Sequence, residues 1–316
     1  MLSRVADSIY WLNRYVERAE NVARFVEVNL NLLLDTPTAD HHWQALVTTT
    51  GDSEFFQERY GAATSENVLQ FLTFDQSYPN SIVSCLKQAR ENAHAVRANI
   101  SSEMWEQLNT VYLTVKQAAS EPMTSDQRYQ FYPDIRMASH LFAGIMEATM
   151  AHNEGWHFGR LGRLLERADK TARILDVKYF ILLPSVQDVG SPLDNLQWVA
   201  LLKSASAYEM YRKCQHRITP ESVASFLILD ADFPRSIRFS IAEAEKSLHC
   251  ISGTPAGGWN CQSDRALGRL RASLDYITLD EIFDQGLHEF LDDLQSKLNA
   301  VGHDIYQDFV AVPLTA

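Results

Sequence analysis

Glycine and proline are scarce in this chain, with 13 glycines and 10 prolines among 316 residues. Both residues interrupt helices and mark turns, so their scarcity leaves room for long helices. No run of apolar residues approaches the ~18 that a membrane-spanning helix needs. We therefore expect no membrane partner.

The beginning of the chain also lacks the apolar stretch of a secretory signal peptide. In "MLSRVADSIYWLNRYVERAEN", charged residues stand where that stretch would lie. The cysteines show no CxxC spacing, which favours free thiols over a disulfide or zinc framework. They are Cys85, Cys214, Cys250 and Cys261. We expect a cytoplasmic protein.

Basic residues are outnumbered by acidic ones, with 28 Lys and Arg against 40 Asp and Glu, for a formal charge of −12. Nucleic acids and anionic membranes both bind more strongly to proteins with net positive charge. The composition therefore disfavours nucleic acid as a partner, although it leaves room for a local basic site.

Several motifs of enzyme chemistry are missing as well. The sequence has no GxxxxGK[ST], GxGxxG or GxSxG. The glycine-rich "GTPAGGWNC" at 253–261 lies between helices, and we interpret it as a flexible connection. Glu154 and His157 form one ExxH, without the further carboxylates of a two-metal bundle site. We expect neither a cofactor nor a metal, and no ATP-binding role.

Helical periodicity dominates what is present. We predict that Thr219 before Pro220 and Ser101 cap helix starts, and that Gly253 and Pro184 end helices. No alternating Val, Ile and Thr run predicts a strand. The expected class is all-α. The predicted helices are 3–34, 42–60, 66–73, 80–99, 102–119, 133–150, 154–183, 193–215, 220–229, 235–251, 263–277 and 279–311.

Two segments occur twice in the same order. "RYVERAENVAR" at 14–24 returns as "RLLERADKTAR" at 163–173, 149 positions later. "ENVLQFLTFDQSYPNSI" at 66–82 aligns with "ESVASFLILDADFPRSI" at 221–237, with eight of seventeen positions identical. We infer a helical bundle built from an internal duplication. Its halves, 1–148 and 149–316, would pack about a pseudo-twofold axis as one globular unit.

Each repeated helix carries a polar stripe with a Glu-Arg pair. At about 100° per residue, Arg14, Glu17, Arg18 and Arg24 share one face, opposite an apolar arc. Phe25 falls inside the polar stripe, which indicates partial burial. Three interpretations stay open: a structural ion-pair network between the halves, a ligand site, or a solvated face.

The ligand-site interpretation names specific residues. Glu17 and Glu166 are the candidates for acid–base roles. A helix N-terminus near Arg235 favours an anion in the second half. The candidate ligand-binding residues are Arg14, Arg18, Arg24, Arg163, Arg167, Arg173 and Arg235.

The chain resembles the bacterial alpha-E family, helical proteins named for a Glu-Arg motif. The matching stretches are "MLSRVADSIYWLNRYVERAENVARF", "PNSIVSCLKQARENAHAVRANISSEMWEQLN", "EGWHFGRLGRLLERADKTARILDVKY", "RITPESVASFLILDADFPRSIRFSIAEAE" and "LGRLRASLDYITLDEIFDQGLHEFLDDLQ". Asn13 and His94 depart from the pattern, which has glycine and arginine there. The resemblance implies genomic neighbours that include ATP-grasp ligases, transglutaminase-like proteins and a proteasome-like peptidase.

We therefore expect a non-catalytic accessory or scaffold protein. It would work with an ATP-grasp ligase or a transglutaminase-like partner in making or processing peptide or amide bonds. The alternative is an enzyme whose Glu-Arg motifs bind and transform an anionic, peptide-like or phosphate-like substrate. The sequence leaves the substrate, the partner surface and homo-oligomer formation open.

Overall fold

The computed structural model describes residues 1–35, 41–120, 123–181 and 192–311, and this part of the chain contains helices and no strand. The expected all-α class is confirmed. The elements are α1 (Ser3–Asp35), α2 (His41–Thr50), α3 (Ser53–Tyr60), α4 (Ser65–Leu69), the π-helix η1 (Gln70–Phe74), α5 (Ile82–Ala95), α6 (Ser102–Ala118), α7 (Ser125–Thr149), α8 (Glu154–Ile181), α9 (Pro192–Ser204), α10 (Tyr208–Cys214), α11 (Pro220–Leu229), α12 (Ile237–Ser252), α13 (Gln262–Tyr276), α14 (Leu279–Gln285) and α15 (Leu287–Phe309).

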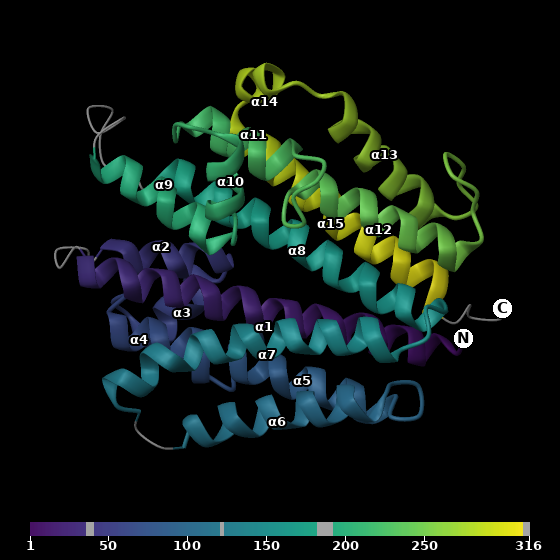
Figure 1. The fold of residues 1–316 in the computed structure, drawn as a ribbon, viewed down its shortest axis with the longest axis horizontal. Helices are drawn as coiled ribbons and strands as arrows, with labels where there is room; N and C mark the ends of the chain where they lie inside the picture. Colours follow the sequence, from purple (N-terminus) through teal and green to yellow (C-terminus); the bar gives the residue numbers. More distant parts are fainter. Residues whose placement is uncertain (36–40, 121–122, 182–191, 312–316) are drawn as a thin grey trace.

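The two long helices α1 and α8 lie side by side at the centre of the molecule (Figure 1). α5 and α7 pack on α1, with α6 outside them, while α12 and α15 pack on α8, with α13 outside. Each central helix has an apolar stripe three to four residues apart that enters the core. Leu12, Val16 and Ala19 are buried on α1, as Leu161, Leu165 and Ala168 are on α8.

The central helices run parallel and approach closely near their first third. The amino group of Met1 pairs with Glu154 at 2.7 Å, and further along Arg18 meets Glu166. A Cβ atom on Gly162 would lie 2.4 Å from the backbone oxygen of Tyr10. The missing side chain at Gly162 therefore allows the two backbones to come together.

The predicted helix ends are confirmed where the structure describes them. Thr219 and Ser101 cap their helices through their side chains, and α12 ends at Gly253, whose φ is +70°. Pro184 lies outside the described residues. Left-handed glycine is favoured at a helix C-terminus because it has no Cβ.

Several predicted helices differ from the structure. The segment 66–73 is divided into α4 and η1, and the helix expected at 80–99 is limited to Ile82–Ala95. The segment 42–60 breaks at Gly51, where φ is +79°, and 279–311 breaks at Gly286, where φ is +100°. The segment 193–215 breaks at Ser206, which has φ of +50°. The helix expected at 133–150 begins earlier because Thr124 forms a capping box, so Pro133 lies inside α7.

The glycine-rich connection after α12 is held by hydrogen bonds rather than being a loose linker. The carboxylate of Asp264 accepts from the Thr254 hydroxyl at 2.5 Å and from the Asn260 backbone N–H at 3.1 Å. It also accepts from the Ser252 hydroxyl at 3.1 Å. The side chain at the start of α13 therefore orders the turn that precedes it.

Candidate functional site: a buried arginine–carboxylate network

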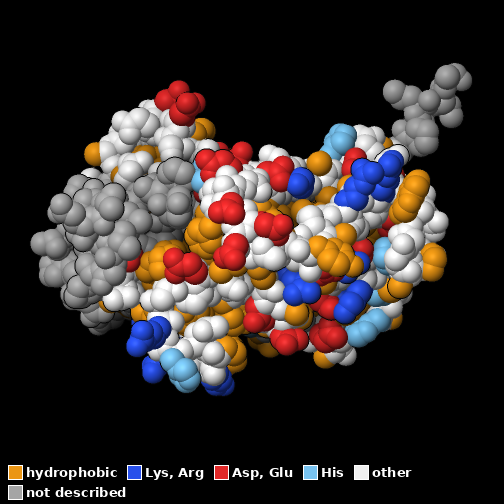
Figure 2. Space-filling model, turned by 90° about the horizontal axis from the view of Figure 1, so that it is seen from above, with side chains coloured by type: hydrophobic (Ala, Val, Ile, Leu, Met, Phe, Trp, Pro, Cys, Tyr) orange, Lys and Arg blue, Asp and Glu red, His pale blue; other side chains and the backbone are white. Residues whose placement is uncertain are grey.

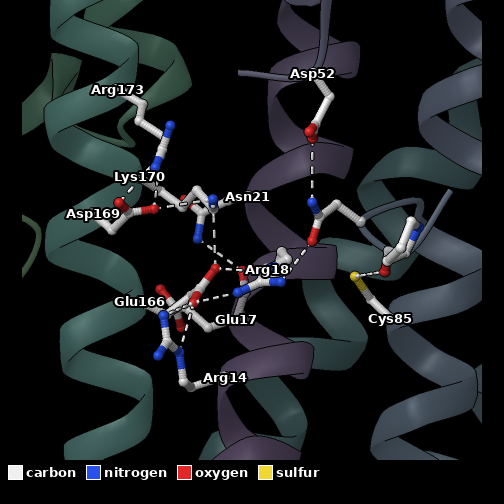
Figure 3. A network of polar contacts seen from close by, with 12 residues as sticks. Arg14, Glu17, Arg18, Asn21, Asp52, Cys85, Glu166, Asp169, Lys170 and Arg173 are labelled. Carbon is white, nitrogen blue, oxygen red and sulfur yellow. Dashed lines mark hydrogen bonds and ion pairs between the residues drawn. The ribbon is translucent and has the colours of Figure 1, made fainter. Parts of the chain in front are cut away.

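The Glu-Arg stripes of α1 and α8 face each other, and each carboxylate pairs with guanidinium groups of the other helix. Arg18 donates from Nε to Glu166 Oε1 at 2.6 Å and from Nη2 to Oε2 at 2.9 Å. Arg14 donates from Nε to the same Oε2 at 2.9 Å. Figure 3 shows both arginines extending from α1 toward Glu166 on α8. The pairing with Arg18 has the two-point geometry that makes such bonds strong.

The reciprocal pair joins Glu17 on α1 to Arg167 on α8. Arg167 donates from Nε to Glu17 Oε1 at 2.7 Å and from Nη2 to Oε2 at 3.1 Å. Glu166 is fully buried and Glu17 is 3% exposed. Both carboxylates are therefore removed from water and depend on their arginine partners.

A third carboxylate extends the network toward α12. Arg235, just before α12, donates to Glu20 at 2.9 Å and lies 3.5 Å from Glu17. Glu20 also pairs with Arg24 one turn along α1. All four side chains are buried. The guanidinium predicted to favour an anion at a helix N-terminus thus lies among carboxylates of the first half of the chain.

Arg18 connects the Glu166 cluster to the loop before α5. Its Nη1 donates to Asn80 Oδ1 at 2.6 Å, and the Asn80 amide lies 3.4 Å from Asp52 Oδ2. Tyr78 donates to the same Asp52 oxygen at 2.7 Å. This chain of contacts anchors the second repeated segment to the central pair (Figure 3).

The remaining predicted arginines lie at the edges of the network. Arg173 donates to Asp169 at 3.0 Å, and its guanidinium lies beside Gly51. Lys170 lies 3.1 Å from Asp169 and 3.6 Å from Glu166. The buried Nε of Arg163 has no hydrogen-bond partner among the described residues.

The electrostatic surroundings keep both Glu-Arg carboxylates ionised. Burial opposes the charge of Glu17, but Arg167 and Arg235 outweigh it and lower the pKa from 4.5 to about 2. Burial likewise opposes the charge of Glu166, and Arg18, Arg14 and Lys170 hold its pKa well below 4.5. Neither carboxyl group can take up a proton near neutral pH.

Burial acts in the opposite direction on the cations of the Glu20 cluster. It lowers the pKa of Arg24 to about 8, with repulsion from Arg235 adding to the effect. Burial lowers the pKa of Arg235 to about 10, although attraction to Glu17 opposes it. His140 lies 3.7 Å from Glu20, and burial lowers its pKa to about 4. Glu20 and Arg24 are almost fully buried, whereas His140 lies at the exposed edge of this cluster.

Acid should unfold the protein over a defined pH range. A lowered carboxyl pKa contributes stability that is present above the unfolded-state value and lost as pH falls toward the folded-state value. For Glu17 these values are 4.5 and about 2. The thermal midpoint, followed by circular dichroism, should therefore fall steeply from about pH 4.5 downward. Glu17→Gln should show a shallower fall, and a midpoint that stays level between pH 5 and 3 would contradict the assignment.

A cavity of about 400 Å³ opens beside the Glu166 cluster. It lies between α1, the start of α8 and α15, and the guanidinium groups of Arg14 and Arg18 border it. A smaller pocket on the other side is bordered by Arg18, Asn80 and Lys170. The Glu166 cluster is thus flanked by open space.

Acidic residues outnumber basic ones in the sequence. Figure 2 shows acidic side chains spread over one face, with Lys and Arg among them rather than in one basic patch. No described helix has an apolar stretch long enough to cross a membrane. Within the described ranges, no three His, Cys, Asp or Glu side chains are grouped so that they could hold a metal ion.

The fold and the network define an all-α protein whose two central helices are joined by reciprocal Glu-Arg pairs. Residues 1–310 match the Alpha-E family, described as "A predicted alpha-helical domain with a conserved ER motif". The chain belongs to this family, as the resemblance of its motifs predicted.

Two curated relatives are similar over nearly the whole chain. They are "Uncharacterized protein Rv2567" of Mycobacterium tuberculosis and "Uncharacterized protein Mb2597" of Mycobacterium bovis, each 23% identical over 331 residues. The alignments cover 98% of this chain and 37% of each relative, so the chain spans little more than a third of their length. No solved structure matches the chain.

The candidate site predicted from the sequence did not include the carboxylate of Glu20 or the amide of Asn80. Glu20 lies on the ER helix, and its spacing of four residues from Arg24 indicated an ion pair. The contact of Glu20 with Arg235, 215 positions away, had no local sequence signal. The sequence indicated only that Asn80 aligns with Arg235 in the second repeated segment, and it gave no sign of the contact between Asn80 and Arg18.

Proposed function

We propose that this protein is a non-catalytic accessory protein of the cytoplasm that docks or presents a substrate for a peptide- or amide-bond-forming enzyme. The observation that carries the proposal is the state of Glu17 and Glu166. Both are buried, bound by guanidinium groups at two points and held ionised. A general acid or base needs a pKa near the working pH and access to its substrate.

The proposed partner is an ATP-grasp ligase or a transglutaminase-like protein. This class comes from the genomic neighbours of the alpha-E family, and the acidic surface is compatible with protein docking. The accessory protein would contribute a rigid helical surface, while the ligase would supply nucleotide binding and chemistry.

We also propose that the chain is an internal duplication with halves 1–148 and 149–316. Equivalent positions make equivalent contacts in support of this. The Ser81 hydroxyl donates to the backbone oxygen of Asp75 at 2.7 Å, and the Ser236 hydroxyl donates to that of Asp230 at 2.5 Å. The reciprocal Arg18–Glu166 and Arg167–Glu17 pairs have the arrangement expected of a pseudo-twofold axis.

A catalytic role is the second candidate, because Arg14 and Arg18 border an open cavity. In that case the arginines would hold an anionic substrate and the Glu-Arg carboxylates would act on it. The lowered pKa of Glu17 weighs against this role.

Co-expression with the neighbouring ATP-grasp ligase tests the proposal. The purified protein alone should release no ADP from ATP, and it should co-purify with the ligase. Glu17→Gln and Glu166→Gln should weaken folding or the complex, because each removes a buried carboxylate that is the counter-charge of partly buried arginines. The exposed control Glu106→Gln should leave both unchanged.

One pattern would overturn the non-catalytic role. If the two Gln variants fold normally and retain the complex, yet abolish ATP-dependent amide formation, the carboxylates act in chemistry. Thermal melts and size-exclusion chromatography would establish the first two conditions, and mass spectrometry of the product would establish the third.

A further inference from the structure

The 400 Å³ cavity beside Glu166 combines apolar walls with a cationic end. Trp11, Phe158, Ile305 and Tyr306 provide aromatic and aliphatic surface, and Arg14 borders the cavity on α1. The Arg14 guanidinium lies over the Trp11 ring, 4.8 Å from its centroid. Apolar walls with a few placed polar groups are typical of small-molecule sites.

Arg14 is not saturated by its described partners. Its Nε and Nη2 serve Glu166, and its Nη1 donates to the Tyr10 hydroxyl at 3.2 Å. These contacts use three of the five N–H groups that a guanidinium carries. The other two can donate to a ligand without breaking the network.

The charges near the cavity also leave a cation uncompensated. Arg14, Arg18 and Lys170 share the single carboxylate of Glu166. Lys170 and Arg173, behind them, share Asp169. Four cations thus face two carboxylates, so an anionic head at Arg14 would meet uncompensated positive charge.

A glycine in the middle of α15 leaves the wall open at this point. A Cβ on Gly302 would lie 3.8 Å from Arg14 Nη1 and 3.9 Å from the Tyr10 hydroxyl, in ordinary contact with both. Glycine is unfavourable inside a helix, and no clash excludes a small side chain here. The missing side chain keeps the guanidinium edge accessible from the cavity.

Asp7 is the acidic residue that lines the cavity. Asp7 precedes Arg14 by two helical turns, roughly 10 Å along the axis of α1. Its side chain hydrogen-bonds to Trp11, so the carboxylate already has a partner on the cavity wall.

We propose that this cavity binds an organic carboxylate with an aromatic or aliphatic body. The carboxylate lies against the free N–H groups of Arg14, and the body packs between Trp11, Phe158 and Tyr306. The inference goes beyond the proposed accessory function, because it concerns binding by this chain alone and requires no ligase.

Titration with 3-phenylpropionate, followed by ligand-observed NMR, tests the proposal on the whole chain. A ligand of this size should bind with Kd on the order of 1 mM. Two control ligands should each bind at least about tenfold more weakly. The amide 3-phenylpropanamide lacks the negative charge that Arg14 would bind, and acetate lacks the phenyl group that would pack on the apolar walls.

Gly302→Leu should fill the cavity and weaken 3-phenylpropionate binding at least about tenfold. The matched control is Gly144→Leu, the same change on an exposed position of α7 with no atoms nearby. It should bind as the wild type does. Circular dichroism melts verify that both variants fold. If Gly302→Leu does not fold, the comparison of the carboxylate with the amide on the wild-type protein still tests the proposal.

Three results would overturn the proposal: no saturable binding of 3-phenylpropionate up to ~20 mM, equal affinity for the amide, or undiminished binding by folded Gly302→Leu. None of them bears on co-purification with a ligase, so failure here is separate from failure of the accessory function.

Discussion

Glu166→Ala will lower the free energy of unfolding by up to about 3–5 kcal/mol, because it leaves the partly buried guanidinium groups of Arg14 and Arg18 without their shared counter-charge. The carboxylate is fully buried and bonds both guanidinium groups. Urea unfolding followed by circular dichroism measures the loss as a lower midpoint at unchanged slope.

The exposed Glu106→Ala provides the control for this substitution. The same change on α6 removes a solvent-facing side chain and should shift the free energy by no more than about 0.5 kcal/mol. If Glu166→Ala unfolds at the wild-type midpoint, the carboxylate is not the counter-charge that Arg14 and Arg18 share, and the solvated-face interpretation returns.

Gly162→Ala should destabilise the protein by about 1–3 kcal/mol or more, although alanine is the better helix former. The new Cβ would lie 2.4 Å from the backbone oxygen of Tyr10, so α1 and α8 must move apart. It would also lie 3.2 Å from Arg14 Cγ, which pulls Arg14 away from Glu166. The same urea experiment measures the loss.

Gly144→Ala is the matched control on an open helix surface. It should stabilise the protein by about 0.5–1 kcal/mol, since nothing opposes the gain in helix propensity. An equal gain from Gly162→Ala would mean that the central helices are farther apart than the structure places them.

The helical class and most helix ends could be predicted from local sequence. The side chains of caps such as Ser101 and Thr219 bond within one helical turn, so a helix start can be predicted from about four consecutive residues. The breaks at Ser206 and Gly286 were missed because apolar periodicity continues across them. A single residue with positive φ redirects the chain there without changing the pattern.

The candidate site was predicted in part. The polar stripe and its position on the helix followed from spacing, so Arg14, Arg18 and Glu17 were expected on one face. Their partners could not be derived, because a stripe does not specify what it meets. The Glu17–Arg167 pair and the Arg235–Glu20 pair depend on how α1, α8 and α12 pack. The cavity wall at Gly302 depends on α15, which no motif connected to the ER helices.

The reciprocal pairing also constrains how the protein is made on the ribosome. Domains fold as their residues emerge at about 5–20 residues per second. Glu17 has no Arg167 partner until α8 has emerged, and Glu20 gains its contact with Arg235 only near the start of α12. The nascent first half therefore presents an unmatched row of charges beside a large apolar face for many seconds. We expect that the side of α1 that meets α8 stays uncovered until α8 has emerged, and that slow codons before the end of α8 would prolong its exposure to chaperones.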